Sequence, residues 1–182
     1  MVRLSVENQD RLIFLAAIVL MAVPFVQIIG FPVPITPETR KYYQTIADVP
    51  QGSNILWVTD QTFGSWVEIK GGEIATVKLL FKMAKERQVH LVFASSYLVP
   101  DGRVLFDQMM AEVLRPGGYL QGLEYGKHYV QLGWLPGWET TLRGLVTDIH
   151  KIAPTDQFGT PIAQIPMMKD IRSGKDFALL GY

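Results

Sequence analysis

The clearest feature of the hydrophobic pattern is an apolar run near the N-terminus. No charged residue occurs from Leu12 to Pro37, which exceeds the roughly 18 apolar residues of a transmembrane helix. A cleaved signal peptide is the main alternative, but the residues before the run carry both charges and no Ala-x-Ala site follows it. A buried core helix is a third alternative, which the lack of a polar face disfavours. We therefore expect a single-pass anchor in the cell membrane.

Prolines shape the end of this run. Pro24 lies inside it and would kink a helix there. From Phe31 to Ile35 two prolines predict an extended strap at the membrane interface, and Thr36-Pro37 then predicts a helix start. We take Pro24 and Phe31 as candidate contacts with membrane partners. Basic residues flank both ends of the run, so the side of the membrane on which the rest lies stays open.

After residue 52 short apolar runs alternate with longer amphipathic stretches. This order predicts an α/β fold: an N-terminal transmembrane helix followed by a small doubly wound, Rossmann-like, mostly parallel sheet of about four strands. The expected parts are an anchor and strap (1–35), a juxtamembrane helix and linker (36–52) and the α/β domain (53–182). The predicted strands cover residues 55–59, 90–94, 129–132 and 177–180, and the predicted helices cover residues 71–88, 101–114 and 138–149.

Composition narrows the classes of function. The chain has 182 residues, with 17 basic and 17 acidic side chains and no cysteine. A balanced charge gives no electrostatic reason to expect nucleic acid as a partner. Without cysteine, thiolate catalysis, a disulfide scaffold and Cys-ligated zinc are excluded. We expect no cofactor.

Ligands of open parallel sheets bind beyond the carboxyl ends of the strands, so candidate chemistry is sought there. Asp60, Ser95 and Gly137 follow three predicted strands and are weak candidates for ligand binding. Asp60 is the best single candidate, although an Asp in that place is more often a helix or turn cap. The segment Gly122–Lys127 resembles a phosphate-binding loop but is one residue short and leads into a strand. We assign no catalytic residue.

Histidine and tryptophan are two further residue types that could form a functional site. His90, His128 and His150 are far apart in sequence and lack a second ligand at metal spacing, so we expect structural histidines and no metal site. Tryptophans in loops are candidate interface anchors, although packing in the core is the default role for each. They are Trp66, Trp134 and Trp138.

Three short segments carry a family resemblance. They are Pro50-Gln51-Gly52-Ser53, residues 125–137 with Tyr-Gly-Lys-His-Tyr-Val-Gln-Leu-Gly-Trp-x-Pro-Gly, and Gly159-Thr160-Pro161. With the apolar N-terminus, they make the chain similar to an uncharacterised family of prokaryotic single-span membrane proteins with a Rossmann-like α/β domain. The resemblance implies that members of this family carry further sequence beyond the equivalent of Leu180, which completes their sheet and from which this sequence departs. It implies no activity and no functional residue.

Two hypotheses about function follow. The first is a non-catalytic accessory subunit that docks on and stabilises a larger integral membrane complex, for example an energy-converting one. Its partners would be membrane protein subunits and lipid. The alternative is a membrane-tethered ligand-binding or enzymatic domain that uses the loops at the carboxyl ends of the strands. The identity of any small-molecule ligand stays open in both.

Overall fold

The computed structural model describes residues 6–26 and 34–182, and the chain divides into two units between Thr39 and Arg40. In the first unit, α1 covers Val6–Val26, and Pro24 lies within its bounds. Phe31 lies outside the described residues. In the described ranges, no helix combines the length and the apolarity that crossing a membrane requires. The N-terminal helix is therefore present, but it is not confirmed as a membrane span.

Helix α2 covers Pro37–Ala47, as the Thr36-Pro37 pattern predicts. The hydroxyl of Thr36 accepts a hydrogen bond from the backbone N–H of Thr39 at 3.2 Å, which satisfies a donor at the helix start. Near the other end of the helix Ile46 is buried, and Tyr42 shares a 2.9 Å hydroxyl contact with Thr76. The helix is thus packed against the α/β domain by its second half.

Four parallel strands form one sheet in the order β3-β2-β1-β4. The strands are β1 (Asn54–Val58), β2 (His90–Ser95), β3 (Tyr129–Trp134) and β4 (Leu179–Gly181). The helices between them are α3 (Phe63–Arg87), α4 (Asp101–Met109), α5 (Glu139–Thr147) and α6 (Ile149–Ile152). Short 3-10 turns at Ile162–Gln164, Pro166–Met168 and Gly174–Asp176 lead into β4. The predicted α/β class and four-stranded parallel sheet are confirmed.

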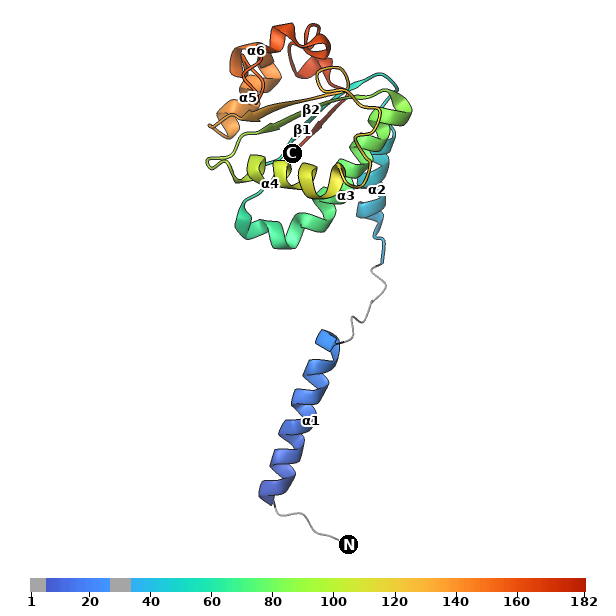
Figure 1. The fold of residues 1–182 in the computed structure, drawn as a ribbon, viewed down its shortest axis with the longest axis vertical. Helices are drawn as coiled ribbons and strands as arrows, with labels where there is room; N and C mark the ends of the chain where they lie inside the picture. Colours follow the sequence, from blue (N-terminus) through green and yellow to red (C-terminus); the bar gives the residue numbers. More distant parts are fainter. Residues whose placement is uncertain (1–5, 27–33) are drawn as a thin grey trace. The chain divides into compact units, whose positions relative to one another are not determined.

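Both faces of the sheet are covered (Figure 1), because successive side chains of a strand point to opposite faces. Ile55 and Trp57 of β1 face α2, α3 and α4 in one apolar cluster. Leu56 and Val58 face α5, α6 and residues 162–177 in the other. This two-sided burial explains why β1 reads as a continuous apolar run rather than an alternating one.

The start of α3 differs from the sequence prediction. The helix begins at Phe63, eight residues before the predicted start at Gly71. Thr62 and Ser65 form a reciprocal capping box, in which each side chain accepts from the other's backbone N–H. Gly71 and Gly72 lie in the helix interior, where each has open space around its Cα.

The stretch predicted as one helix from 101 to 114 changes geometry part-way. After α4, the residues Met110–Leu114 form a π-helical turn, and the N–H of Arg115 donates to the carbonyl of Met110 at 3.0 Å, five residues back. The edge strand β3 is irregular too, since its register with β2 shifts between Phe93 and Ser95. Both irregularities lie on the β3 side of the domain.

Candidate functional site

Asp60 lies beyond the carboxyl end of β1 and binds the loop that follows β2. One carboxylate oxygen accepts from the backbone N–H groups of Ser96 and Tyr97, the latter at 3.1 Å, and from the hydroxyl of Ser95 at 3.3 Å. The other oxygen accepts from the hydroxyl of Ser96. The structure therefore brings together two of the predicted site residues, Asp60 and Ser95.

The geometry around Asp60 is that of a structural cap. Ser95 and Ser96 are almost completely buried, and donors from three consecutive residues converge on one carboxylate. Helix α4 closes the same place, because a Cβ on Gly102 would lie 2.0 Å from the carbonyl oxygen of Thr59 and 3.0 Å from the hydroxyl of Ser95. Asp60 thus joins the ends of β1 and β2, as in the turn role that the sequence left open.

Gly137 does not join Asp60 and Ser95 in this network. It has φ +128°, where a Cβ would lie 2.7 Å from the hydroxyl oxygen of Thr141, so the turn before α5 requires glycine. Trp138 follows with φ +44°, a region that bulky residues rarely adopt. Its N–H donates to the carbonyl of Ser96 at 2.7 Å, so the turn is attached to the loop after β2.

The predicted tryptophans have different surroundings. Trp66 is partly buried against the α3 side of the core. Trp134 is half-buried and its indole N–H donates to the carbonyl of Tyr97 at 2.8 Å. Trp138 is exposed, stacks edge-to-face with Tyr97 and donates its indole N–H to the hydroxyl of Tyr182 at 2.7 Å. An interface role stays a prediction for all three.

Several exposed apolar side chains follow the carboxyl ends of the strands in the chain. We call this set the carboxyl-edge patch: Phe63, Val67, Leu98, Val99, Trp138 and Tyr182. Its members follow the ends of β1, β2, β3 and β4, which parallel pairing brings to one edge of the sheet. The backbone N–H of Phe63 donates to the carboxylate of Asp101 at 3.1 Å, which connects the start of α3 to the start of α4. At this edge the polar groups of Asp60, Ser95 and Ser96 are bonded to one another, whereas the apolar side chains of the patch are exposed.

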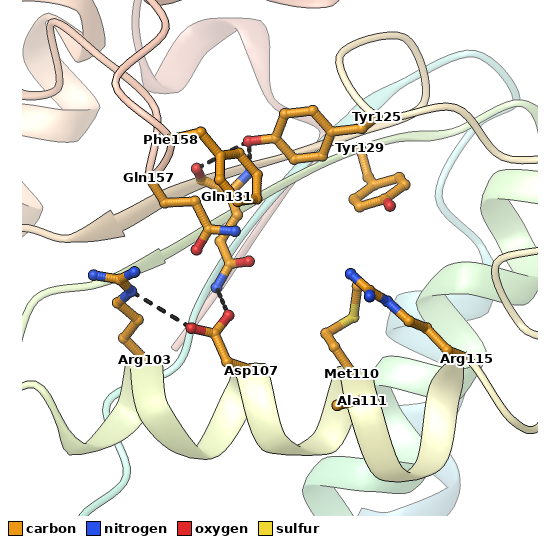
Figure 2. A pocket seen from close by; sticks show the side chains of 10 residues that line it. All are labelled: Arg103, Asp107, Met110, Ala111, Arg115, Tyr125, Tyr129, Gln131, Gln157 and Phe158. Carbon is orange, nitrogen blue, oxygen red and sulfur yellow. Dashed lines mark hydrogen bonds and ion pairs between the residues drawn. The ribbon is translucent and has the colours of Figure 1, made fainter.

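A second concave site lies beside β3, away from the predicted residues. We call it the lateral pocket: a cavity of about 230 Å³ between α4, the π-turn, β3 and the loop at 157–158. Figure 2 shows side chains from these segments turned toward one space. The lining residues are Arg103, Asp107, Met110, Ala111, Arg115, Tyr125, Tyr129, Gln131, Gln157 and Phe158.

Hydrogen bonds fix much of the pocket wall. Tyr125 donates its hydroxyl proton to the buried carboxylate of Asp156 at 2.9 Å and accepts from the N–H of Gln131 at 3.3 Å. Gln131 in turn donates from its side-chain amide to Asp107 at 3.0 Å. Burial raises the pKa of Tyr125 far above its ordinary value, so the hydroxyl keeps its proton. These hydrogen bonds fix the positions of Tyr125 and Gln131 in the pocket wall.

The three histidines have structural contacts. His90 pairs with the side-chain oxygen of Asn54 at 3.1 Å, and His128 accepts from the N–H of Glu124 at 2.8 Å. His150 faces the carbonyls of Met168 and Ile171, each at 3.0 Å, which places its proton on Nε2. These contacts agree with the structural role expected from the sequence.

The lateral pocket was missed at the sequence level, although signals for it existed. Arg103, Asp107, Ala111 and Arg115 recur at intervals of four residues, and Gln131 interrupts an apolar strand. Gly133 in the same strand indicates a bulge or a close backbone approach. No sequence pattern, however, connects residues 156–158 to β3.

Comparison with known proteins adds no further constraint. No protein-family model, curated protein or solved structure matches the chain. The resemblance to a single-span membrane family therefore stays a prediction, and the site must be interpreted from its own geometry.

Proposed function

We propose that the chain is a non-catalytic, single-pass accessory subunit that docks on a larger integral membrane protein complex. The proposal rests on one observation at the carboxyl edge of the sheet: its polar groups are paired with one another and its apolar side chains are exposed. There the carboxylate of Asp60 is occupied by donors from Ser95, Ser96 and Tyr97, while the carboxyl-edge patch faces outward. An edge of this kind suits contact with another protein better than capture of a polar substrate.

The aromatic part of the patch has the properties of an interface anchor. Trp138 is held by its stacking on Tyr97 and by its hydrogen bond to Tyr182, so little side-chain freedom would be lost on docking. Tryptophan and tyrosine are enriched among residues that dominate binding energies. The backbone strain at φ +44° is consistent with a position that is kept for its contacts. A partner with an apolar, uncharged surface fits this patch.

The membrane part of the proposal is supported by the pattern of α1. Every residue from Leu12 to Ala22 is apolar, so the helix has apolar side chains on all sides. A helix of this kind is stable when its whole circumference is covered, and lipid or membrane helices of a partner provide such cover. The complex would thus hold the chain by two regions, the N-terminal helix and the carboxyl-edge patch.

The test is extraction of the tagged chain from its own membranes in a mild detergent, followed by native mass spectrometry. We expect the chain in a defined complex much larger than its own 20.5 kDa. Val67→Glu combined with Phe63→Glu should release it, because their side chains are 86% and 55% exposed and charge would be buried on docking.

Tyr43→Glu is the matched control for this pair. Its side chain is 54% exposed on α2, outside the patch, so the complex should survive the substitution. Recovery of the wild-type chain alone would overturn the proposal. Equal behaviour of the patch variant and the control would show that the patch is not the docking surface.

A further inference from the structure

The lateral pocket contains polar groups that the fold itself does not use. Within the described part of the chain, Oε1 of Gln157 is fully buried and has no hydrogen-bond partner. A buried acceptor without a donor is costly, and native structures rarely keep one unless water or a ligand satisfies it. Figure 2 shows the amide of Gln157 turned toward the same space as the side chains of Gln131 and Asp107.

Two arginines line the pocket, and they differ in their ion-pair partners. Arg103 pairs with Asp107 at 3.5 Å, which compensates that carboxylate. Among the described residues no carboxylate lies within ion-pair distance of Arg115, whose positive charge partly offsets the rise in pKa that burial gives the Tyr129 hydroxyl. Figure 2 shows the guanidinium of Arg115 pointing from the helix end toward Tyr129. The charged residues that line the pocket, Arg103, Asp107 and Arg115, therefore sum to one net positive charge, and the nearby carboxylate of Asp156 is held by the Tyr125 hydroxyl.

The π-turn explains how Arg115 reaches this pocket. Each α-helical residue turns by about 100°, so in a regular helix Arg115 would point roughly 120° away from Arg103. A π-turn has about 4.4 residues per turn, or about 82° per residue. Its five residues, Met110–Leu114, bring Arg115 back to within roughly 30° of Arg103. Such turns are frequent at functional sites, and here the turn aims a cation into a cavity.

Hydrogen bonds and close packing also fix the opposite wall of the pocket. The N–H of Gln157 donates to the carbonyl of Gln131 at 3.0 Å, beside the register shift of β3. Gly133 permits this approach, since its Cβ would lie 3.2 Å from that of Gln157. Asp156 accepts from the N–H groups of Phe158 and Thr160 at 2.9 and 2.8 Å, which fixes the loop. Gln157 is therefore held at the cavity by the fold.

From these features we infer that the lateral pocket binds a small organic carboxylate with an apolar body and an N–H or O–H donor. Arg115 would pair with the carboxylate, Gln157 would accept from the donor, and the rings of Tyr125, Tyr129 and Phe158 would contact the body. The volume of about 230 Å³ is below the roughly 300–1,000 Å³ of pockets for drug-sized ligands, so the ligand is a single ring or a short chain.

Phosphate shares the attraction to Arg115 but fits less well. A phosphate dianion needs more donors than one guanidinium supplies, whereas one guanidinium can pair with a single carboxylate in a bidentate way. This inference does not rest on the proposed function. Docking is attributed to the carboxyl-edge patch, and the two sites have separate readouts.

The test is isothermal titration of the full chain in detergent micelles with four probes: 4-hydroxybenzoate, benzoate, 4-hydroxybenzamide and inorganic phosphate. We expect 4-hydroxybenzoate to bind most tightly, because among the four probes it alone combines a carboxylate, an O–H donor and an apolar ring. Arg115→Gln should weaken it at least tenfold and leave 4-hydroxybenzamide nearly unchanged. Gln157→Leu should abolish the preference for 4-hydroxybenzoate over benzoate.

Arg143→Gln is the matched control, since Arg143 is an exposed arginine on α5 that pairs with Glu139 and does not line the pocket. Thermal unfolding of every variant establishes that it is folded. Absence of binding by all four probes at millimolar concentration would overturn the inference, and so would tighter binding of phosphate than of 4-hydroxybenzoate. Equal weakening by Arg115→Gln and Arg143→Gln would place the binding elsewhere and overturn it too.

Discussion

Removal of the Asp60 carboxylate tests whether it is a structural cap. Asp60→Ala deletes the acceptor for the backbone N–H groups of Ser96 and Tyr97 and for the hydroxyls of Ser95 and Ser96. The hydroxyls can rotate toward other acceptors, whereas the N–H groups cannot. Ser96 is completely buried, so its N–H would be left without water as a substitute.

The expected loss follows from these contacts. A hydrogen bond to a charged acceptor contributes about 1.5–3 kcal/mol, and an unpaired buried donor costs about 1–3 kcal/mol. Because Asp60 itself is only partly buried, water can reach the outer part of this site but not the N–H of Ser96, and we expect a total of about 3 kcal/mol. For a chain of this length that lowers Tm by roughly 6–12 °C. Asp60→Asn keeps one oxygen for the two N–H groups and should lose about half as much.

Urea unfolding followed by tryptophan fluorescence measures this loss, with the full chain in detergent. Asp170→Ala is the control, because Asp170 is an exposed aspartate on the surface and should change stability by less than about 0.5 kcal/mol. An Asp60→Ala variant as stable as Asp170→Ala would refute the role of the Asp60 carboxylate as a structural cap. It would return Asp60 to the set of candidate ligand-binding residues.

Three other predictions concern the fold. Gly102→Ala should lower the free energy of unfolding by about 3 kcal/mol or prevent folding, because its Cβ would meet the carbonyl of Thr59; urea unfolding measures this. Gly71→Ala should stabilise the chain by about 0.5–1 kcal/mol in the same assay, since α3 has open space there. A Gly102→Ala variant with wild-type stability, or a destabilising Gly71→Ala, would contradict the packing described for α4 and α3. Burial, aided by the nearby His128, lowers the pKa of His90, so the unfolded chain binds its proton first. Stability should therefore fall as the pH decreases below about 6.5, and His90→Gln should flatten that part of the pH profile of unfolding; an unchanged profile would contradict it.

Local patterns in the sequence were sufficient for the class of fold. Ile55–Val58 and Leu91–Ala94 are continuous apolar runs because both faces of their strands are covered, which periodicity records directly. The start of α2 was predictable as well, since a capping side chain and Pro37 act within one turn. The start of α3 was mispredicted because its capping box was not recognised and Gly71-Gly72 suggested an opening.

Only the tertiary structure determines which groups the candidate site residues contact. Asp60 could be placed at the end of β1 from sequence, but its saturation by Ser95, Ser96 and Tyr97 depends on residues more than thirty positions away. The lateral pocket needs a π-turn that rotates Arg115 and a loop that meets β3 at Gln157. Periodicity reports which side of an element is buried, because burial repeats with the turn of a helix or the alternation of a strand. Which distant groups satisfy one another is set by packing between elements, and no local pattern contains it.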